Sequence, residues 1–84
     1  MGIKVNSMRC DGFDQAIIGI VEIPETRIVY SKQRMVEILI LDGQTREEAI
    51  EYLEFNTWCV QGEGYPIYLD IMDTEEVYQY VENA

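Results

Sequence analysis

The sequence predicts a single small α+β domain in which a sheet of two or three strands packs against three or four helices. Three observations favour this class: a length of 84 residues, an apolar fraction of 48%, and apolar spacings that change along the chain between a helical period and the period of two that is typical of strands. A chain of this length buries roughly 60% of the surface of its unfolded form, which is enough for one thin core. We therefore expect residues 1–84 to fold as one domain.

The first element combines helix and strand signals. Apolar side chains fall at helical spacing, at Phe13, Ala16, Ile17, Ile20 and Val21. Asp11 precedes them where a helix N-cap belongs, so the spacing predicts a short helix over residues 12–22. The alternative is a buried strand over residues 16–23, because the segment is rich in β-branched residues and Gly19 costs a helix about 1 kcal/mol. Pro24 ends the element in either case.

A strand and two helices are predicted next. Charged and apolar residues alternate over residues 27–30, which predicts a brief strand, and Ser31 then stands where a helix N-cap belongs. Apolar side chains wrap most of the circumference of residues 32–41, as in a helix that lies at the centre of a core or in a subunit interface. An Asp-Gly pair ends this helix, and a capping box that begins at Thr45 starts a second helix over residues 46–58. Together these two helices predict a helical hairpin.

The last third of the chain predicts a strand and a helix. Apolar residues stand at every second position of residues 65–71, which is the clearest strand pattern in the sequence. Asp73 or Thr74 can cap a final helix whose apolar residues share one face. Residues 3–5 are a candidate for the third strand of the sheet.

The residue inventory excludes most catalytic classes. The chain contains no His, and it therefore lacks the usual general base near neutral pH and the commonest transition-metal ligand. Cys10 and Cys59 stand far apart without a C-x-x-C spacing, so we expect two free thiols in a reducing compartment. Neither a calcium-binding loop nor a phosphate-binding glycine loop is present. We expect no enzymatic activity, no cofactor and no metal site.

Membrane insertion and secretion are not predicted either. No run of about 18 apolar residues occurs in the chain, and the N-terminal residues lack the apolar segment of a secretory signal. We therefore expect a cytoplasmic protein.

Charge is distributed unevenly along the chain. Sixteen Asp and Glu residues against six Lys and Arg give a net charge of -10, which disfavours direct contact with nucleic acid or with an anionic membrane. Residues 1–34 carry five basic and four acidic side chains, whereas residues 35–84 carry one basic and twelve acidic ones. We expect a strongly negative, protein-binding surface on this second part, formed by Glu47, Glu51, Glu54, Glu63, Glu75 and Glu76.

Three of these glutamates form a stripe along the predicted helix over residues 46–58. Glu47, Glu51 and Glu54 are spaced by three or four residues, which places one negative charge every ~5 to 6 Å along the axis. One DNA strand presents a phosphate every ~3.4 Å, so the two charge densities agree within about a factor of two. The stripe is compatible with a mimic of nucleic acid. The alternative is an ordinary solvated helix face, since Glu is a strong helix former.

Aromatic side chains are frequent in the last part of the chain. Trp58, Tyr65 and Tyr68 belong to the residue types that are enriched in interface hot spots. Packing in the core and on the sheet explains them equally well, so both alternatives stay open. Residues 35–41 likewise fit either the core or a homodimer interface.

Three segments carry a resemblance to a known family. They are DGFDQAIIG at residues 11–19, MVEILI followed by DGQTREEAIEYLEFN within residues 35–56, and GEGYPI at residues 62–67. In these segments the chain resembles a family of small conserved proteins encoded by tailed bacteriophages, over roughly residues 10–70. The resemblance implies a phage origin and a location in the cytoplasm of the infected bacterium. The family carries no assigned biochemical role, and no catalytic residues come with it.

Taken together, these observations predict a non-enzymatic phage accessory protein. We expect it to bind a host protein with a basic surface, such as a nucleic-acid-binding or defence protein, through its acidic surface. One alternative is a structural or scaffolding homo-oligomer held together by residues 35–41. A carboxylate-dependent enzyme or a divalent-cation binder is a third.

Overall fold

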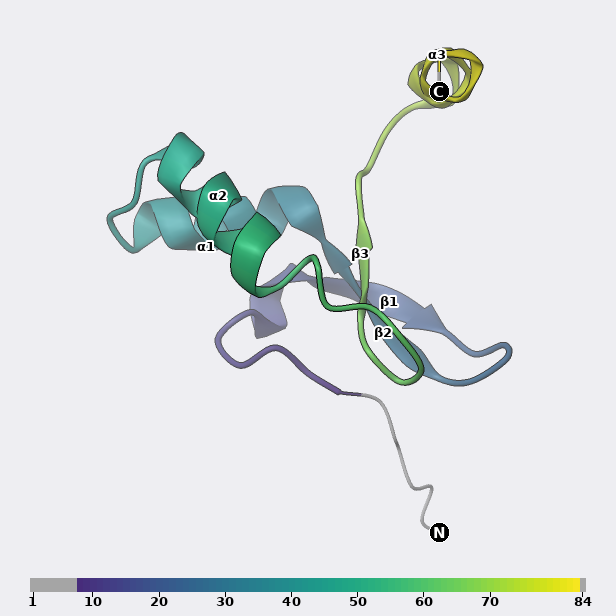
Figure 1. The fold of residues 1–84 in the computed structure, drawn as a ribbon, viewed down its shortest axis with the longest axis horizontal. Helices are drawn as coiled ribbons and strands as arrows, with labels where there is room; N and C mark the ends of the chain where they lie inside the picture. Colours follow the sequence, from purple (N-terminus) through teal and green to yellow (C-terminus); the bar gives the residue numbers. More distant parts are fainter. Residues whose placement is uncertain (1–7, 84) are drawn as a thin grey trace, which may run out of the picture.

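The structure is a computed structural model, and it describes residues 8–83. Its elements are, in chain order, η1 (Asp14–Ala16), β1 (Ile17–Val21), β2 (Arg27–Ser31), α1 (Lys32–Leu41), α2 (Arg46–Asn56), β3 (Ile67–Leu69) and α3 (Thr74–Glu82). Within the described residues, three α-helices and a three-stranded mixed sheet make a small α+β fold, which confirms the predicted class (Figure 1). The candidate strand over residues 3–5 lies outside the described residues.

β2 lies at the centre of the sheet. β1 pairs with it in the antiparallel sense, with Ile17 opposite Tyr30 and Ile20 opposite Ile28. β3 pairs with its other edge in the parallel sense, with Tyr68 beside Tyr30. Parallel neighbours need a long crossover connection, and α1 and α2 supply it between β2 and β3 (Figure 1).

The helix predicted for residues 12–22 is wrong, and the alternative, a strand within residues 16–23, is confirmed. One turn of 3-10 helix follows Phe13 without a side-chain cap, and β1 begins at Ile17. The pairing of β1 with β2 shifts register between Ile17 and Gly19. Such a bulge interrupts the strict alternation of a strand, so the period-two signal was hidden from a sequence pattern. Pairing with the next strand, β2, then decided the conformation that the local spacing left open.

Capping residues begin α1 and α2 where the sequence predicts. The Ser31 hydroxyl accepts a hydrogen bond from the Arg34 backbone N–H over 3.2 Å. Thr45 and Glu48 form a reciprocal capping box, with hydrogen bonds of 2.9 and 3.1 Å. Gly43 turns the chain between the two helices with a φ of 109°, a conformation that side chains disfavour. The two helices pack against each other.

Two elements are shorter than predicted. α2 ends at Asn56 rather than at residue 58, and β3 covers residues 67–69 rather than 65–71. Pro66 precedes β3 and has no N–H to donate to a ladder. Beyond β3 the backbone of Ile71 bonds the Gln33 side chain instead of a strand: the Gln33 amide donates to the Ile71 carbonyl over 3.3 Å and accepts the Ile71 N–H over 3.4 Å.

The core lies where the sheet meets α1 and α2. Its buried residues are Phe13, Ala16, Tyr30, Met35, Val36, Leu39, Ala49 and Leu53. Three of them belong to α1, and Ile38 and Ile40 are partly buried against the same cluster. The apolar residues 35–41 therefore lie mainly in the core, while Leu41 at the end of α1 is exposed.

α3 stands apart from this body, at the end of an extended segment (Figure 1). Asp73 and Glu76 form a reciprocal capping box at its start, as Thr45 and Glu48 do in α2. No residue of α3 is buried. The segment before it is held to the body by an ion pair of 3.1 Å between Lys32 Nζ and Asp70 Oδ2. α3 is thus tethered to the body without packing on it.

Candidate protein-binding surface

α2 has one side in the core and one side in solvent. Ala49 and Leu53 are fully buried, and they lie four residues apart on the side that faces α1. Glu47, Glu51 and Glu54 point the other way and are exposed. The predicted orientation of this stripe is confirmed. Because Ala49 and Leu53 face the core, the helical period places the three glutamates on the opposite side, in solvent.

The carboxylates of this stripe carry no internal partner. Among residues 8–83 the one ion pair is that of Lys32 with Asp70, and none involves α2. Glu48 differs from its neighbours, because its carboxylate accepts the Thr45 N–H at the helix start. Three negative charges on α2 are therefore available to a partner.

Two aromatic side chains flank the stripe, and neither is among the predicted site residues. Phe55 is 73% exposed, and Tyr52 is exposed as well. Phe55 follows Glu51 by four residues, which puts it on the same side of the helix. The exposure of Phe55 could have been predicted from the sequence, because its spacing from Ala49 and Leu53 places it on a different side of the helix from this buried pair. We call Glu47, Glu51, Glu54, Phe55 and Tyr52 the α2 face.

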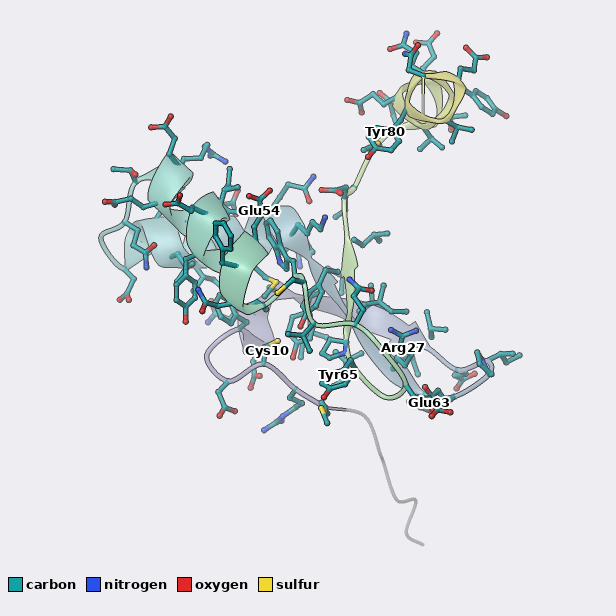
Figure 2. The ribbon with its side chains drawn as sticks, viewed as in Figure 1. Cys10, Arg27, Glu54, Glu63, Tyr65 and Tyr80 are labelled. Atoms are coloured by element: carbon teal, nitrogen blue, oxygen red, sulfur yellow. The ribbon has the colours of Figure 1, made fainter. Side chains whose placement is uncertain are left out.

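Glu63 lies elsewhere, in the loop before β3. Figure 2 shows it near the turn between β1 and β2, in the same region as Arg27 and well away from Glu54. This loop is fastened to that turn by two hydrogen bonds: the Gly64 N–H donates to the Glu25 carboxylate over 2.7 Å, and Arg27 Nε donates to the Tyr65 carbonyl over 2.8 Å. Long-range bonds of this kind decide where the loop lies, and spacing along the chain does not encode them.

Glu75 and Glu76 lie on α3, and thus on a third part of the molecule. Glu76 caps the helix by accepting the Asp73 N–H over 3.0 Å, and Glu75 in the first turn is exposed. Carboxylates at these positions favour the N-terminal end of the helix dipole. The six predicted glutamates therefore fall into three groups, on α2, in the loop before β3 and on α3.

Of the predicted aromatic side chains, Trp58 packs against the core. Its ring N–H donates to the sulfur of Met35 over 3.5 Å. Lys32 Nζ lies 4.9 Å from its ring centroid, within the range of a cation–π contact. These contacts favour the packing alternative for Trp58.

Tyr68 is also engaged inside the molecule. Its ring centroid lies 5.9 Å from that of Tyr30, and its hydroxyl shares a hydrogen bond of 3.0 Å with the Cys10 thiol. The Tyr30 hydroxyl accepts the Cys10 backbone N–H over 2.8 Å. Burial raises the pKa of Tyr68, with the Cys10 hydrogen bond adding to the shift, and burial also raises the pKa of Tyr30. The cluster fastens the chain before η1 to the sheet.

Tyr65 lines a crevice that borders the α2 face. The crevice has a volume of about 280 Å³ and lies between the end of α2, the residues around Cys10 and the loop before β3. Its lining includes Tyr52, Asn56, Tyr65 and Tyr68. Tyr52 belongs to both the crevice and the α2 face, so the two features form one continuous surface.

Metal ligands do not gather in the part of the chain that the structure describes. No group of three or more Cys, Asp or Glu side chains there could hold a metal ion. No helix among residues 8–83 is long and apolar enough to span a lipid bilayer.

No protein-family model, curated protein or solved structure matches the chain significantly. The likeness to tailed-phage proteins therefore stays a resemblance of the segments named above.

Proposed function

We propose that the protein is a non-enzymatic accessory protein of a tailed phage that binds a host protein with a basic surface through the α2 face. In this proposal α1 and α2 act as one helical hairpin, in which α1 supplies the core and α2 supplies the contact. Host nucleic-acid-binding proteins and defence proteins are the partners that such a surface suits, because their own ligands are polyanions.

The single observation that carries the proposal is the exposure of Phe55 among carboxylates. Burying a large aromatic side chain on binding contributes roughly 1.5–3 kcal/mol, a gain that exposed carboxylates alone do not offer. Aromatic anchors surrounded by polar groups are typical of interface hot spots. Phe55 beside Glu51 and Glu54 has this arrangement.

The same arrangement specifies the chemistry of the partner. Glu47, Glu51 and Glu54 require Lys or Arg side chains at a matching spacing, and Phe55 requires an apolar pocket between them. The crevice behind Tyr52 can receive one side chain of the partner in return. Complementary charge steers the encounter, and the buried aromatic side chain slows dissociation.

The test begins with capture of bacterial proteins on the full chain in a buffer of low ionic strength. Affinity for a captured protein is then measured for the unchanged chain and for Phe55→Ala. Removing a central aromatic anchor costs about 2 kcal/mol, so we expect Phe55→Ala to weaken binding roughly 30-fold. Undiminished affinity of Phe55→Ala would exclude the α2 face as the contact.

The charge contribution is tested with two triple variants that change the net charge equally. Glu47→Gln, Glu51→Gln and Glu54→Gln together should abolish binding and its dependence on salt. The matched control changes exposed acidic residues outside α2, namely Glu22→Gln, Glu37→Gln and Glu82→Gln. Equal losses in both triple variants would show that net charge alone acts, which would contradict a specific site on α2.

A further inference from the structure

A second cavity adjoins the crevice at the end of α2. It is a groove of about 450 Å³, and its lining comes from the residues before η1, the C-terminal end of α1 and α2. Asp11, Phe13 and Tyr52 line both this groove and the crevice, so the two cavities meet at Tyr52. We call the second cavity the Tyr52 groove.

The floor of the Tyr52 groove is apolar and preformed. Phe13 and Leu39 line it and are buried members of the core cluster, each 9% exposed. Ile38 lines it too and packs against the same cluster. Core packing therefore fixes the shape of this floor. Tyr52 is 47% exposed and supplies the aromatic part of the lining.

The charged residues of the Tyr52 groove are all negative. Asp11 and Asp42 line it, and both are exposed. Neither forms an ion pair within residues 8–83, where the one ion pair is that of Lys32 with Asp70. No Lys or Arg side chain lines the groove, whereas Arg9 lines the neighbouring crevice. The groove thus combines an apolar floor with two carboxylates that have no cation of their own.

Backbone contacts hold the two aspartates at the groove from different parts of the chain. Asp42 is the C-cap of α1, and its N–H donates to the Ile38 carbonyl over 3.1 Å. Asp11 directly follows Cys10, whose backbone N–H donates to the Tyr30 hydroxyl over 2.8 Å. The position of both carboxylates is therefore set by the fold of the body before any ligand arrives, which lowers the cost of binding.

An apolar floor, an aromatic ring and two carboxylates match the chemistry of an arginine side chain. Arginine joins an apolar stem to a planar guanidinium with several N–H donors. The guanidinium can bond more than one carboxylate and can stack on an aromatic ring, while the stem covers apolar surface. The ammonium of lysine is a compact and more strongly hydrated charge, and it makes less use of such a lining.

We propose that the Tyr52 groove receives an arginine side chain of the protein partner, with the guanidinium at Asp11 and Asp42 and the stem against Phe13 and Leu39. The inference rests on the proposed function for the identity of the partner as a protein. Tyr52 belongs to the α2 face and to the groove, so a protein that lies on the α2 face reaches the groove directly. Charge complementarity selects a basic side chain for this position.

The first test titrates the full chain with N-acetyl-arginine methylamide and follows the backbone amide signals by NMR. We expect saturable shifts at the residues of the groove, with an affinity in the millimolar range because exposed ion pairs contribute little. The citrulline derivative has the same shape without the charge, and it should bind at least about fivefold more weakly. Equal affinity for the citrulline or the lysine derivative, or shifts outside the groove alone, would overturn the proposal.

The second test repeats the arginine titration with matched variants at exposed positions. Asp42→Asn removes one carboxylate of the groove and should weaken binding about three- to fivefold, whereas Glu22→Gln removes the same charge in the turn between β1 and β2 and should leave binding unchanged. Equal losses in both variants would show that net charge alone acts, and would overturn the proposal.

The contribution of the aromatic ring is tested at Tyr52. Tyr52→Phe keeps the ring and should retain the affinity for the arginine probe, whereas Tyr52→Leu keeps an apolar side chain without a ring and should lower it. Because Tyr52 is exposed, neither substitution opens a cavity in the core, and circular dichroism checks that the fold is kept. Equal affinities of Tyr52→Leu and the unchanged chain would overturn the stacking of the guanidinium.

These experiments separate the inference from the proposed function. The titrations need no host protein, so they report on the groove whether or not the α2 face binds one. If Phe55→Ala weakens host binding and the double variant Asp11→Asn, Asp42→Asn does not, the α2 face stands and the arginine assignment is overturned. If the arginine probe binds in the groove while Phe55→Ala leaves host binding undiminished, the groove is supported and the α2 face is excluded.

Discussion

α2 and α3 begin in the same way and end in different surroundings. Each starts with a reciprocal capping box, Thr45 with Glu48 and Asp73 with Glu76, and each carries acidic residues in its first turn. α2 buries Ala49 and Leu53 completely, whereas α3 buries nothing. The comparison teaches that a capping signal fixes where a helix begins, and that burial of one side fixes whether the helix belongs to the core.

The largest expected difference between the two helices lies in their apolar residues. Leu53→Ala leaves a cavity in the core and should lower the free energy of unfolding by about 3 kcal/mol. Val81→Ala, on exposed α3, should change it by less than about 0.5 kcal/mol at low protein concentration. Urea denaturation of both variants checks this, and a large effect of Val81→Ala in a dilute monomer would mean that α3 is part of the core.

The capping residues should give a smaller difference. Thr45→Ala removes one hydrogen bond at the start of α2 and should cost about 1 kcal/mol of global stability. Asp73→Ala removes the equivalent bond in α3, and it should speed amide exchange in α3 while leaving the unfolding midpoint of the body unchanged. Hydrogen exchange followed residue by residue separates the two effects. A shift of the unfolding midpoint by Asp73→Ala would contradict the independence of α3.

Alkaline pH should destabilise the body through two of its tyrosines. Burial raises the pKa of Tyr30 and of Tyr68, whereas in the unfolded chain both titrate near their ordinary value of about 10. The stabilising contribution of these two neutral hydroxyls is therefore complete below pH ~10, and it is lost as the pH rises from there toward the folded-state values. The urea midpoint of unfolding should therefore be lower above pH 10 than at pH 8, and this decrease should be smaller in Tyr68→Phe. An equal decrease of the midpoint in Tyr68→Phe would exclude Tyr68 as a source of the lost stability.

The smallest effect is expected at the junction between the body and α3. The ion pair of Lys32 with Asp70 is partly exposed, so Asp70→Asn should cost about 0.5 kcal/mol or less. The Asp70→Asn substitution should nevertheless loosen the segment before α3. A spin label attached through Tyr80→Cys, in a chain that also carries Cys10→Ser and Cys59→Ser, would detect this as faster motion. If the label is equally mobile with and without Asp70, the Gln33 hydrogen bonds alone hold the segment before α3 in place.

Much of the helical part of the fold could be predicted, because its signals are local. Ser31, Thr45 and Asp73 each act on a backbone N–H three residues away, so a short stretch of sequence contains the complete interaction. The orientation of Glu47 and Glu51 followed from the period of one helix. These are the parts of the prediction that the structure confirms.

The candidate site could be predicted only in part. The carboxylates of the α2 face were expected, but Phe55 was missed because the prediction considered only the acidic residues of the outer side of this helix. Glu63 was expected near the other glutamates and lies near the turn between β1 and β2 instead, since the bond between Gly64 and Glu25 joins residues 39 positions apart. No pattern of spacing encodes such a contact.

The sequence by itself determined the α+β class, the starts of the helices, the uneven distribution of charge and the absence of His chemistry. Only the tertiary structure decided that residues 17–21 form a strand, that the predicted glutamates fall into three groups, and that α3 buries none of its side chains. The physical reason is range: caps and helical phase act over three or four residues, whereas strand pairing and burial join residues that are far apart along the chain.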